Sequence, residues 1–330
     1  MDILYSFLLI LLLTGAAIIG FEVSGLTVIF AVVIPYACIA IFLFGIVYQV
    51  IKWSMSPVPF HIPTVAGQQK SLSWIKSNPL ESPHTTAGVV GRMILEILFF
   101  RSLFRNTKME MKSGPVLTYG STKYLWLGAM AFHWSLLVIL LRHLRLFMQP
   151  IPHFVIYIQS LDGFFQAGVP DVYITDVLIL LALLFLFLRR IIDFKVRYIS
   201  MASDYFPLFL ILAIVTTGVM MRYFTRVDIV KVKEFATGLF SLHPFVPQGI
   251  GLIFYIHLFL VCTLLAYFPF SKLLHMPGIF LSPTRNLANN SRMKRHVNPW
   301  NHPVRVHTYE EYEDEFREKM KEAGLPVEKE

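Results

Sequence analysis

The sequence predicts an all-α integral membrane protein, in which six transmembrane helices are accompanied by a long cytoplasmic loop and a polar carboxyl-terminal tail. Three observations support this class. Of the 330 residues, 55% are hydrophobic and 15% are charged, whereas soluble domains carry roughly 25% charged residues. The mean hydropathy is +0.60. Apolar runs also recur that can cross a hydrocarbon core of ~30 Å, which takes about 17 to 25 helical residues.

Six segments have the length and composition of membrane spans. They are residues 3–21, 26–51, 124–147, 172–190, 205–222 and 250–271. The first resembles a secretory signal in length, but Asp2 stands where a cleaved signal carries Lys or Arg, and a second span follows almost at once. We therefore expect the first segment to remain in the membrane.

Basic residues between the spans predict the direction of each span. Residues 52–123 hold nine Lys and Arg against three acids, residues 189–204 hold four, and the tail 272–307 holds six with no acid. The connection 148–172 holds none. Because basic loops remain in the cytoplasm, both termini are expected on the cytoplasmic side of the cell membrane. Residues 222–249 run against this pattern, since they hold four basic residues on the expected outer side.

Four regions follow from this topology. They are two amino-terminal membrane helices (1–51), a basic cytoplasmic loop with an amphipathic helix (52–123), a four-helix membrane core (124–271) and a cytoplasmic tail (272–330). The net charge of +8 indicates cytoplasmic loops rather than nucleic-acid binding, because the basic residues lie between apolar spans. Cys38 and Cys262 lie inside apolar runs, which predicts small packing groups rather than a disulfide framework or a zinc site.

Two segments outside the membrane are predicted to be helical. In residues 87–105, apolar side chains recur at helical spacing between charged ones, which indicates a helix on the membrane surface or against a partner. Residues 308–323 open with the capping-box pattern Thr308-x-x-Glu311 and predict a short acidic helix, either solvated or docked. The preceding residues 283–307 indicate an extended loop.

Histidines stand inside two of the predicted spans. In the segment AFHWSLLVILLRHLR (131–145), His133 lies mid-span and His143 lies near the outer end. In the last span, His257 lies near the outer end and His275 lies at the cytoplasmic end. An ionisable residue in hydrocarbon is costly and marks a candidate functional site, although a single histidine can equally be a hydrogen-bonded packing residue.

The spacing of these histidines predicts two pairs. On one continuous helix, His257 and His275 are separated by about five whole turns and share a face, whereas His133 and His143 differ by about 80°. The two spans run in opposite directions, so we expect His143 to meet His257 near the outer surface and His133 to meet His275 toward the cytoplasm. The rises differ, at about 15 Å against about 27 Å, which predicts inclined helices and a bend at Pro269.

Two imidazoles that converge from opposite helices are what six-coordinate haem iron requires, since the porphyrin supplies the in-plane nitrogens. The sequence therefore predicts a bundle that binds two b-type haems through these four histidines, with iron centres roughly 20 Å apart. No C-x-x-C-H motif for covalent attachment is present. Arg142 and Arg145 flank His143 and are candidates to bind haem propionates or, equally, to reach lipid headgroups.

The remaining histidines do not share this pattern and are predicted to lie at surfaces. They are His61, His84, His153, His243, His296, His302 and His307.

The H-x9-H pair, His133 and His143, and the H-x17-H pair, His257 and His275, resemble the ligands of the respiratory nitrate reductase gamma-subunit family of dihaem cytochromes b. Both spacings and the pairing of the first histidine with the last agree with that family. The additional amino-terminal span, the basic loop 52–123 with FFRSLFRN, and the polar tail are most similar to the DsrM-type cytochrome b of the sulfite-reduction-associated Dsr (or Hme) membrane complex. These departures from the nitrate reductase type put a nitrate reductase partner in doubt.

The resemblance implies electron exchange with menaquinone or another quinone near one haem, and a cytoplasmic iron–sulfur partner resembling heterodisulfide reductase. It also implies a multihaem cytochrome c, a periplasmic ferredoxin-like protein and a second integral membrane subunit, with a sulfur-carrier trisulfide or disulfide as terminal substrate. Quinone chemistry requires a proton path to water. Asp162, Asp171 and His153 on the expected outer side are candidates for that path, without support from a motif.

Two other function classes remain open on the sequence. A proton-coupled transporter would use the intramembrane histidines as a relay, but it predicts broken helices and matching repeats, neither of which is evident in the sequence. A cofactor-free membrane anchor for a cytoplasmic enzyme would leave the four histidines without a role.

Overall fold

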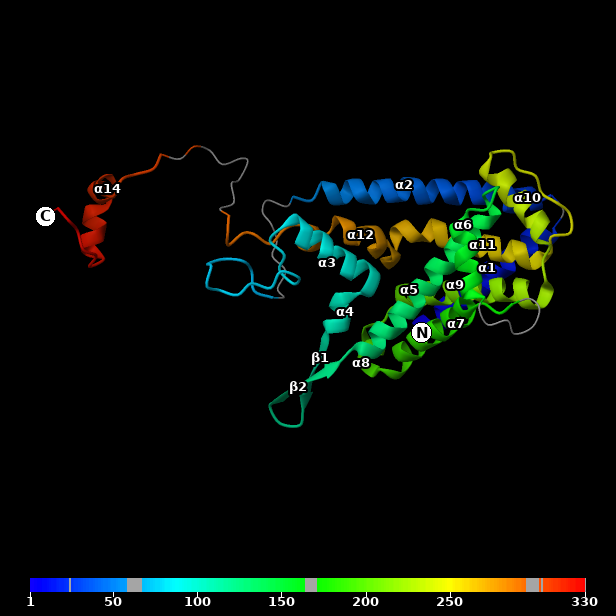
Figure 1. Ribbon diagram of the computed structural model, residues 1–330, viewed down its shortest axis with the longest axis horizontal. Coiled ribbons are helices and arrows are strands. Elements are labelled where there is room, and N and C mark those ends of the chain that lie inside the picture. The colour runs from blue at the N-terminus through cyan, green and yellow to red at the C-terminus, as the bar shows by residue number, and fades with distance from the viewer. Residues whose placement is uncertain (24, 58–66, 164–170, 295–302, 304, 330) are drawn as a thin grey trace.

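The computed structural model describes residues 1–23, 25–57, 67–163, 171–294, 303 and 305–329. Most of these residues are helical, and the helices form an elongated bundle (Figure 1). In the first half, the elements are α1 (Asp2–Glu22), a π-helical turn (Ile29–Val33), α2 (Ile34–Ser54), α3 (Thr86–Phe99), α4 (Arg101–Arg105), β1 (Thr107–Lys112), β2 (Val116–Ser121), α5 (Lys123–His143) with a 3-10 turn (Leu144–Leu146), and α6 (His153–Asp162).

The second half begins with α7 (Ile174–Ile192), α8 (Phe194–Ile199) and α9 (Ala202–Val219), which continues as a π-helical turn (Met220–Thr225). The remaining elements are α10 (Ile229–Phe240), α11 (Leu252–Tyr267), two 3-10 turns (Phe268–Phe270 and Lys272–Leu274), α12 (His275–Leu281), α13 (Pro283–Asn286) and α14 (Tyr309–Glu322).

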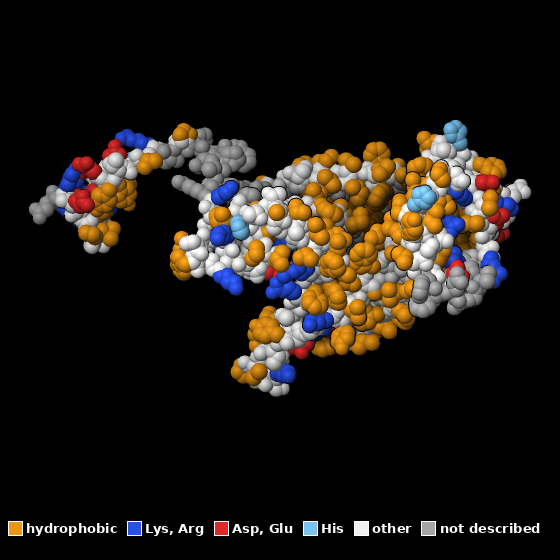
Figure 2. All heavy atoms as spheres, in the orientation of Figure 1, with side chains coloured by type: hydrophobic (Ala, Val, Ile, Leu, Met, Phe, Trp, Pro, Cys, Tyr) orange, Lys and Arg blue, Asp and Glu red, His pale blue; other side chains and the backbone are white. Residues whose placement is uncertain are grey.

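Five helical stretches in the described part of the chain are long and apolar enough to cross a membrane. They are Asp2–Glu22, Ile29–Ser54, Lys123–Leu146, Ala202–Thr225 and Leu252–Phe270. The remaining predicted span is α7, a helix of 19 residues that includes Asp176, Arg189 and Arg190 and is therefore less apolar. Large apolar side chains face outward over much of the bundle (Figure 2), with Leu12 68% and Phe44 76% exposed. Such a surface requires hydrocarbon as its solvent, so the chain is a multi-pass membrane protein.

Neighbouring helices form a continuous series across the bundle. Helix α5 packs on α7, α7 packs on α9, α9 packs on α1 and α11, and α11 packs on α2. Small residues permit close approach: a side chain at Gly128 on α5 would collide with the Phe185 ring on α7, and a Cβ at Gly45 would lie 2.7 Å from Pro269. Such small residues at contacts are typical of membrane helix packing, where dispersion rather than water exclusion drives association.

The last predicted span is not one continuous helix. Helix α11 ends at Tyr267, Ser271 is extended (φ −121°, ψ 173°), and α12 begins at His275. Pro269 removes a backbone donor, and the Ser271 side chain instead accepts a hydrogen bond from Leu273 N, which starts a new turn. The prediction that His257 and His275 share one helix face is therefore wrong, whereas the predicted irregularity at Pro269 is confirmed and is larger than a bend.

The basic loop also differs in part from its prediction. The expected helix over 87–105 is present but is divided at Phe100, which adopts a left-handed conformation (φ 48°) between α3 and α4. Strands β1 and β2 then form an antiparallel hairpin, so the fold is not all-α throughout. The sequence contained a signal for this hairpin, since polar and apolar residues alternate in TKMEMK and a glycine, Gly114, follows. In the structure, Gly114 forms the turn with φ +85°.

The predicted acidic helix in the tail is confirmed as α14. Thr308 Oγ1 accepts a hydrogen bond from Glu311 N at 3.2 Å, and the Glu311 carboxylate accepts one from Thr308 N at 3.1 Å, which completes the predicted capping box. The predicted extended loop 283–307 begins with the short helix α13, and part of it, like His61, His296 and His302, lies outside the described residues.

Candidate functional site

Two of the predicted histidines meet in one half of the bundle, here called the inner end because it is the half expected to face the cytoplasm. His133 on α5 and His275 at the start of α12 have ring centres 6.0 Å apart, with an interplanar angle of 83°. Imidazole nitrogens bind transition metals at about 2 Å, so two rings on opposite sides of one metal lie roughly 6 Å apart centre to centre. The interruption after α11 is what brings His275 to this position.

The hydrogen bonds of these rings fix which nitrogen is free. His133 Nδ1 lies 2.8 Å from Ala129 O, and His275 Nδ1 lies 2.9 Å from Lys272 O. At the other end of α5, His143 Nδ1 lies 2.7 Å from Ile139 O. A carbonyl oxygen can only accept, so Nδ1 must carry the proton in each ring and Nε2 keeps its lone pair. This is the arrangement that orients a histidine as a metal ligand.

The Nδ1 atom of His257 is hydrogen-bonded to a side chain instead of a backbone carbonyl. Its Nδ1 lies 2.9 Å from Thr217 Oγ1 on α9, and that hydroxyl lies 2.9 Å from the carbonyl oxygens of Ala213 and Ile214. With the single hydroxyl proton donated to one of these carbonyls, the Thr217 oxygen accepts from His257 Nδ1. In the neutral imidazole, the hydrogen bond at Nδ1 then leaves Nε2 as the nitrogen with a lone pair in all four predicted ligands.

The second pair lies at the opposite, outer end. His143 and His257 are near enough to interact electrostatically, and Gly218 leaves room beside the His257 ring, since a Cβ there would lie 3.5 Å from His257 Cε1. The side chains of His143 and His275 are exposed in the protein alone, so they border space that protein atoms do not fill. Helices α5 and α11 do not pack closely against each other, and the apolar face is hollowed beside α2 (Figure 2).

These observations fit haem better than a bare ion. Among residues 1–23, 25–57, 67–163, 171–294, 303 and 305–329, no group of three or more His, Cys, Asp or Glu gathers around a common point. Haem iron needs two axial ligands from the protein, and each histidine pair offers two imidazoles, of which one is exposed in the protein alone.

Aromatic side chains surround the inner pair. Phe100 and Phe132 each contact the His133 ring edge to face, with ring centres 5.0 Å apart in both cases. Phe132 comes from the same helix, whereas Phe100 comes from the corner between α3 and α4. The inner site therefore contains a residue from the cytoplasmic loop, which the sequence reasoning placed away from the histidines.

Charged side chains gather at the outer end instead. Arg142 Nη1 lies 3.0 Å from Asp162 Oδ2, and Arg142 also pairs with Asp176. All three are buried, at 8%, 6% and 8% exposed respectively. The Tyr173 ring lies between two guanidinium groups, with Arg142 at 3.9 Å and Arg222 at 3.8 Å from its centre. These contacts tie α5, α6, α7 and the end of α9 together.

The two carboxylates in this cluster have further partners. Asp162 accepts hydrogen bonds from Thr175 N at 2.9 Å and Thr175 Oγ1 at 2.7 Å, so it holds the first turn of α7. Tyr223 donates to Asp176 Oδ2 at 2.8 Å. The sequence reasoning missed the roles of Asp176 and Tyr223, although an acid inside the predicted span 172–190 was a signal for such a cluster.

The remaining predicted site residues have these positions. Arg145 donates to Gln159 Oε1 at 3.0 Å, next to the outer cluster. The backbone carbonyl of Asp171 accepts from Arg222 at 3.1 Å, and the exposed His153 begins α6. Propionate binding by Arg142 and Arg145 stays a prediction, and Arg142 already has two carboxylates as neighbours.

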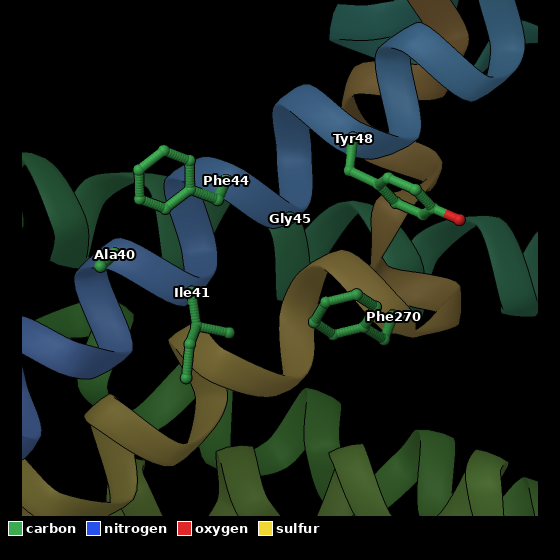
Figure 3. A pocket seen from close by; sticks show the side chains of 6 residues that line it. All are labelled: Ala40, Ile41, Phe44, Gly45, Tyr48 and Phe270. Carbon is green, nitrogen blue, oxygen red and sulfur yellow. The ribbon is translucent and has the colours of Figure 1, made fainter.

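An apolar groove of about 380 Å³ lies between α2 and the turn that follows α11 (Figure 3). It is lined by Ala40, Ile41, Phe44, Gly45, Tyr48 and Phe270. Phe270 belongs to the turn after α11, and Gly45 contacts Pro269 in the same turn. No charged or histidine side chain lines this groove, so it is a hydrophobic surface rather than a redox site.

Comparison with known proteins identifies the family of this chain. Residues 93–296, which include all four, match the nitrate reductase gamma subunit family. The chain is 44% identical over 280 residues to a protein of Archaeoglobus fulgidus named Hdr-like menaquinol oxidoreductase cytochrome b-like subunit, covering 83% of each chain. It is 41% identical over 274 residues to the protein of the same name from Archaeoglobus profundus, covering 81% of each. The chain therefore belongs to the nitrate reductase gamma subunit family, as a nitrate-reductase-gamma-like cytochrome b.

Proposed function

We propose that this chain is a dihaem b-type cytochrome that transfers electrons between a membrane quinone and a cytoplasmic iron–sulfur subunit. The observation that carries the proposal is the inner pair, in which His133 and His275 lie 6.0 Å apart between ring centres and both have Nδ1 committed to a carbonyl. His133 and His275 would hold the inner haem, and His143 and His257 the outer one. Bound haem supplies one-electron chemistry at its iron.

The chain's own residues prepare both sites. The carbonyls of Ala129, Ile139 and Lys272 and the hydroxyl of Thr217 orient the four rings and make each Nε2 a better donor. Apolar and aromatic side chains exclude water around His133. At the outer end, buried Arg142 and Arg145 beside it are the candidates for propionate oxygens.

Membrane topology is part of the proposal. Six spans with both termini in the cytoplasm require alternating helix directions. The contacts agree with this: Gly128 meets Phe185 and Arg142 meets Asp176, so α5 and α7 are antiparallel, and Ser6 bonds to Ala202 while Ile10 packs on Leu210, so α1 and α9 are parallel. On this basis α7 crosses the membrane, with its charged residues near the two ends.

The names of the two relatives support menaquinol as the electron donor or acceptor and a heterodisulfide-reductase-like partner. We propose both for this chain, within a sulfur-metabolism complex of the Dsr type that includes a multihaem cytochrome c, a periplasmic ferredoxin-like protein and a second membrane subunit. Quinol oxidation releases protons. Asp162, Asp171 and His153 belong to the outer end, and they are our candidates for passing these protons to water, Asp162 through its contacts with Arg142 and Thr175.

A visible difference spectrum tests the proposal. The purified chain, reduced with dithionite and compared with its oxidised form, should show sharp b-type α and Soret bands with about two haems per chain. A transporter or a cofactor-free anchor gives a flat spectrum after expression with ample haem. The interruption after α11 is a feature that transporters share, so the spectrum is needed to separate the two classes, and a flat spectrum would falsify the haem assignment.

A further inference from the structure

A corner of the cytoplasmic loop contacts the proposed inner haem ligand. Phe100, between α3 and α4, has φ 48° and ψ 47° and places its ring 5.0 Å from the His133 ring, at an interplanar angle of 84°. A bulky residue rarely adopts this left-handed conformation, which persists only where the surroundings hold it in place. The strain is therefore located beside His133, at the contact between the loop and α5.

Two tryptophans of α5 hold this corner. Trp126 Nε1 donates to Phe99 O at 2.7 Å, and Trp134 Nε1 donates to Leu98 O at 3.1 Å. These carbonyls belong to the last turn of α3, where no intrahelical donor remains. Trp134 is the immediate neighbour of His133, so the end of α3 is attached to α5 on both sides of the ligand.

The other half of α3 is attached to the segment that carries His275. Arg92, 8% exposed, donates to Thr284 O at 3.2 Å and also to Arg285 O. Arg285 pairs with Glu96 at 2.7 Å. These residues of α13 follow α12, which begins at His275. Helix α3 therefore connects the two chain segments that supply the inner imidazoles.

We propose that the α3–α4 corner (Leu98, Phe99 and Phe100) is a positioning element that fixes the orientation of His133 and so sets the reduction potential of the inner haem. Phe100 limits rotation of the His133 ring, and the bonds from Trp126 and Trp134 keep Phe100 in place. This inference rests on the proposed function, because it assigns a role toward the inner haem. The physical basis is that groups around a ligand fix its ring orientation and donor strength, which tune the metal.

The test is a redox titration of the full-length haem-loaded chain, followed in the α band and by low-spin electron paramagnetic resonance. Phe100→Leu removes the ring, and Phe100→Gly also relieves the left-handed strain. Each should retain two haems yet change the reduced-to-oxidised ratio of the inner haem at a fixed potential by roughly tenfold, the order of the effect that loss of an outer partner of a metal ligand has on metal affinity or activity. The g values of the inner haem should shift as well, and Phe100→Tyr should restore both readouts.

Matched variants make the outcome specific. Leu242 also has a positive φ, of 60°, but lies away from the inner pair, so Leu242→Gly should leave the inner haem unchanged. Trp126→Phe and Trp134→Phe remove one hydrogen-bond donor each and should shift the reduction potential of the inner haem in the same direction as Phe100→Leu. These two variants test the inference even if a Phe100 variant does not fold.

Two results overturn the inference. One is an unchanged inner-haem titration in Phe100→Leu, and the other is an equal shift of both haems, which would indicate general loosening of the bundle. Failure of the proposed function is seen separately, as absence of b-type bands in the unsubstituted chain.

Discussion

The middle and the outer end of α5 each carry a histidine proposed as a haem ligand, and the two lie in opposite surroundings. His133 and His143 each bond Nδ1 to the carbonyl four residues earlier. His133 then lies among aromatic rings and beside a loop corner, whereas His143 follows buried Arg142 with its two carboxylates. One helix therefore orients both imidazoles in the same way, while neighbouring elements decide the electrostatic setting of each. Substitutions at the two sites can separate these two contributions.

Removing one ligand from each end should remove a different haem. His133→Ala should lose the inner haem and keep the outer one, and His143→Ala should do the reverse, because each pair is built from two separate segments. Haem-to-protein ratios should fall from about two to about one in both, with different bands lost in redox titrations. Equal loss of both haems from either variant would show that the two ends are not independent.

Loss of Arg142 at the outer end should lower the stability of the protein far more than loss of the nearby Arg145. Arg142→Met leaves Asp162 and Asp176 buried without their cation, which costs roughly 3 to 5 kcal/mol of stability. Arg145→Gln removes a hydrogen bond to Gln159 and should cost about 1 kcal/mol. Unfolding in detergent, followed by circular dichroism, measures both. Adding Asp162→Asn and Asp176→Asn to Arg142→Met should recover part of the loss, and no recovery would mean that packing rather than charge explains it.

The outer site also has a hydrogen bond that a substitution can remove. Thr217→Val takes away the acceptor of His257 Nδ1, while the carbonyl acceptors at His133, His143 and His275 have no side chain to replace. We expect both haems to remain and the outer haem alone to change its potential and g values, with a stability cost of about 1 kcal/mol. Thr263→Val is the control, since the Thr263 hydroxyl bonds to Phe259 O and to no histidine. A change confined to the inner haem would contradict the assigned pairs.

A smaller effect is expected for the stability of α8, which the Asp193 carboxylate caps outside the membrane at the inner end. Burial opposes ionisation of Asp193, but N–H groups of Val196 and Lys195 and the ammonium of Lys108 lower the pKa of its carboxyl below the usual value. The stabilisation of α8 by this cap is therefore present above the ordinary pKa and is lost as pH falls through the lowered one. Hydrogen exchange of the α8 amides measures this loss as the pH is lowered from about 5 to about 3, through the ordinary range of carboxyl pKa values. Asp193→Asn should keep the cap and abolish this pH dependence.

Much of the ligand set was readable from the sequence because hydrophobicity and spacing report it directly. The apolar runs predicted the spans, and the intramembrane histidines were conspicuous against them. The Thr308-x-x-Glu311 pattern predicted α14, because a capping box is a local interaction between residues close in the chain. The predicted meeting of His133 with His275 agrees with the structure, although the helix argument used for His275 was wrong.

Other features of the site depend on contacts that no local pattern encodes. Phe100 is more than thirty residues from His133, and the outer cluster joins Asp162, Asp176 and Tyr223 from three elements. A spacing rule assumes a regular helix, so it fails where Ser271 is extended and redirects the chain.

The sequence alone determined the membrane environment, the two histidine-bearing segments and the residue types proposed to bind iron, because composition and periodicity are properties of the chain itself. The tertiary structure alone decided where His275 lies, which loop residue touches His133, and which carboxylates neutralise Arg142. Those outcomes depend on packing between segments distant in sequence, where burial must be matched by a specific partner.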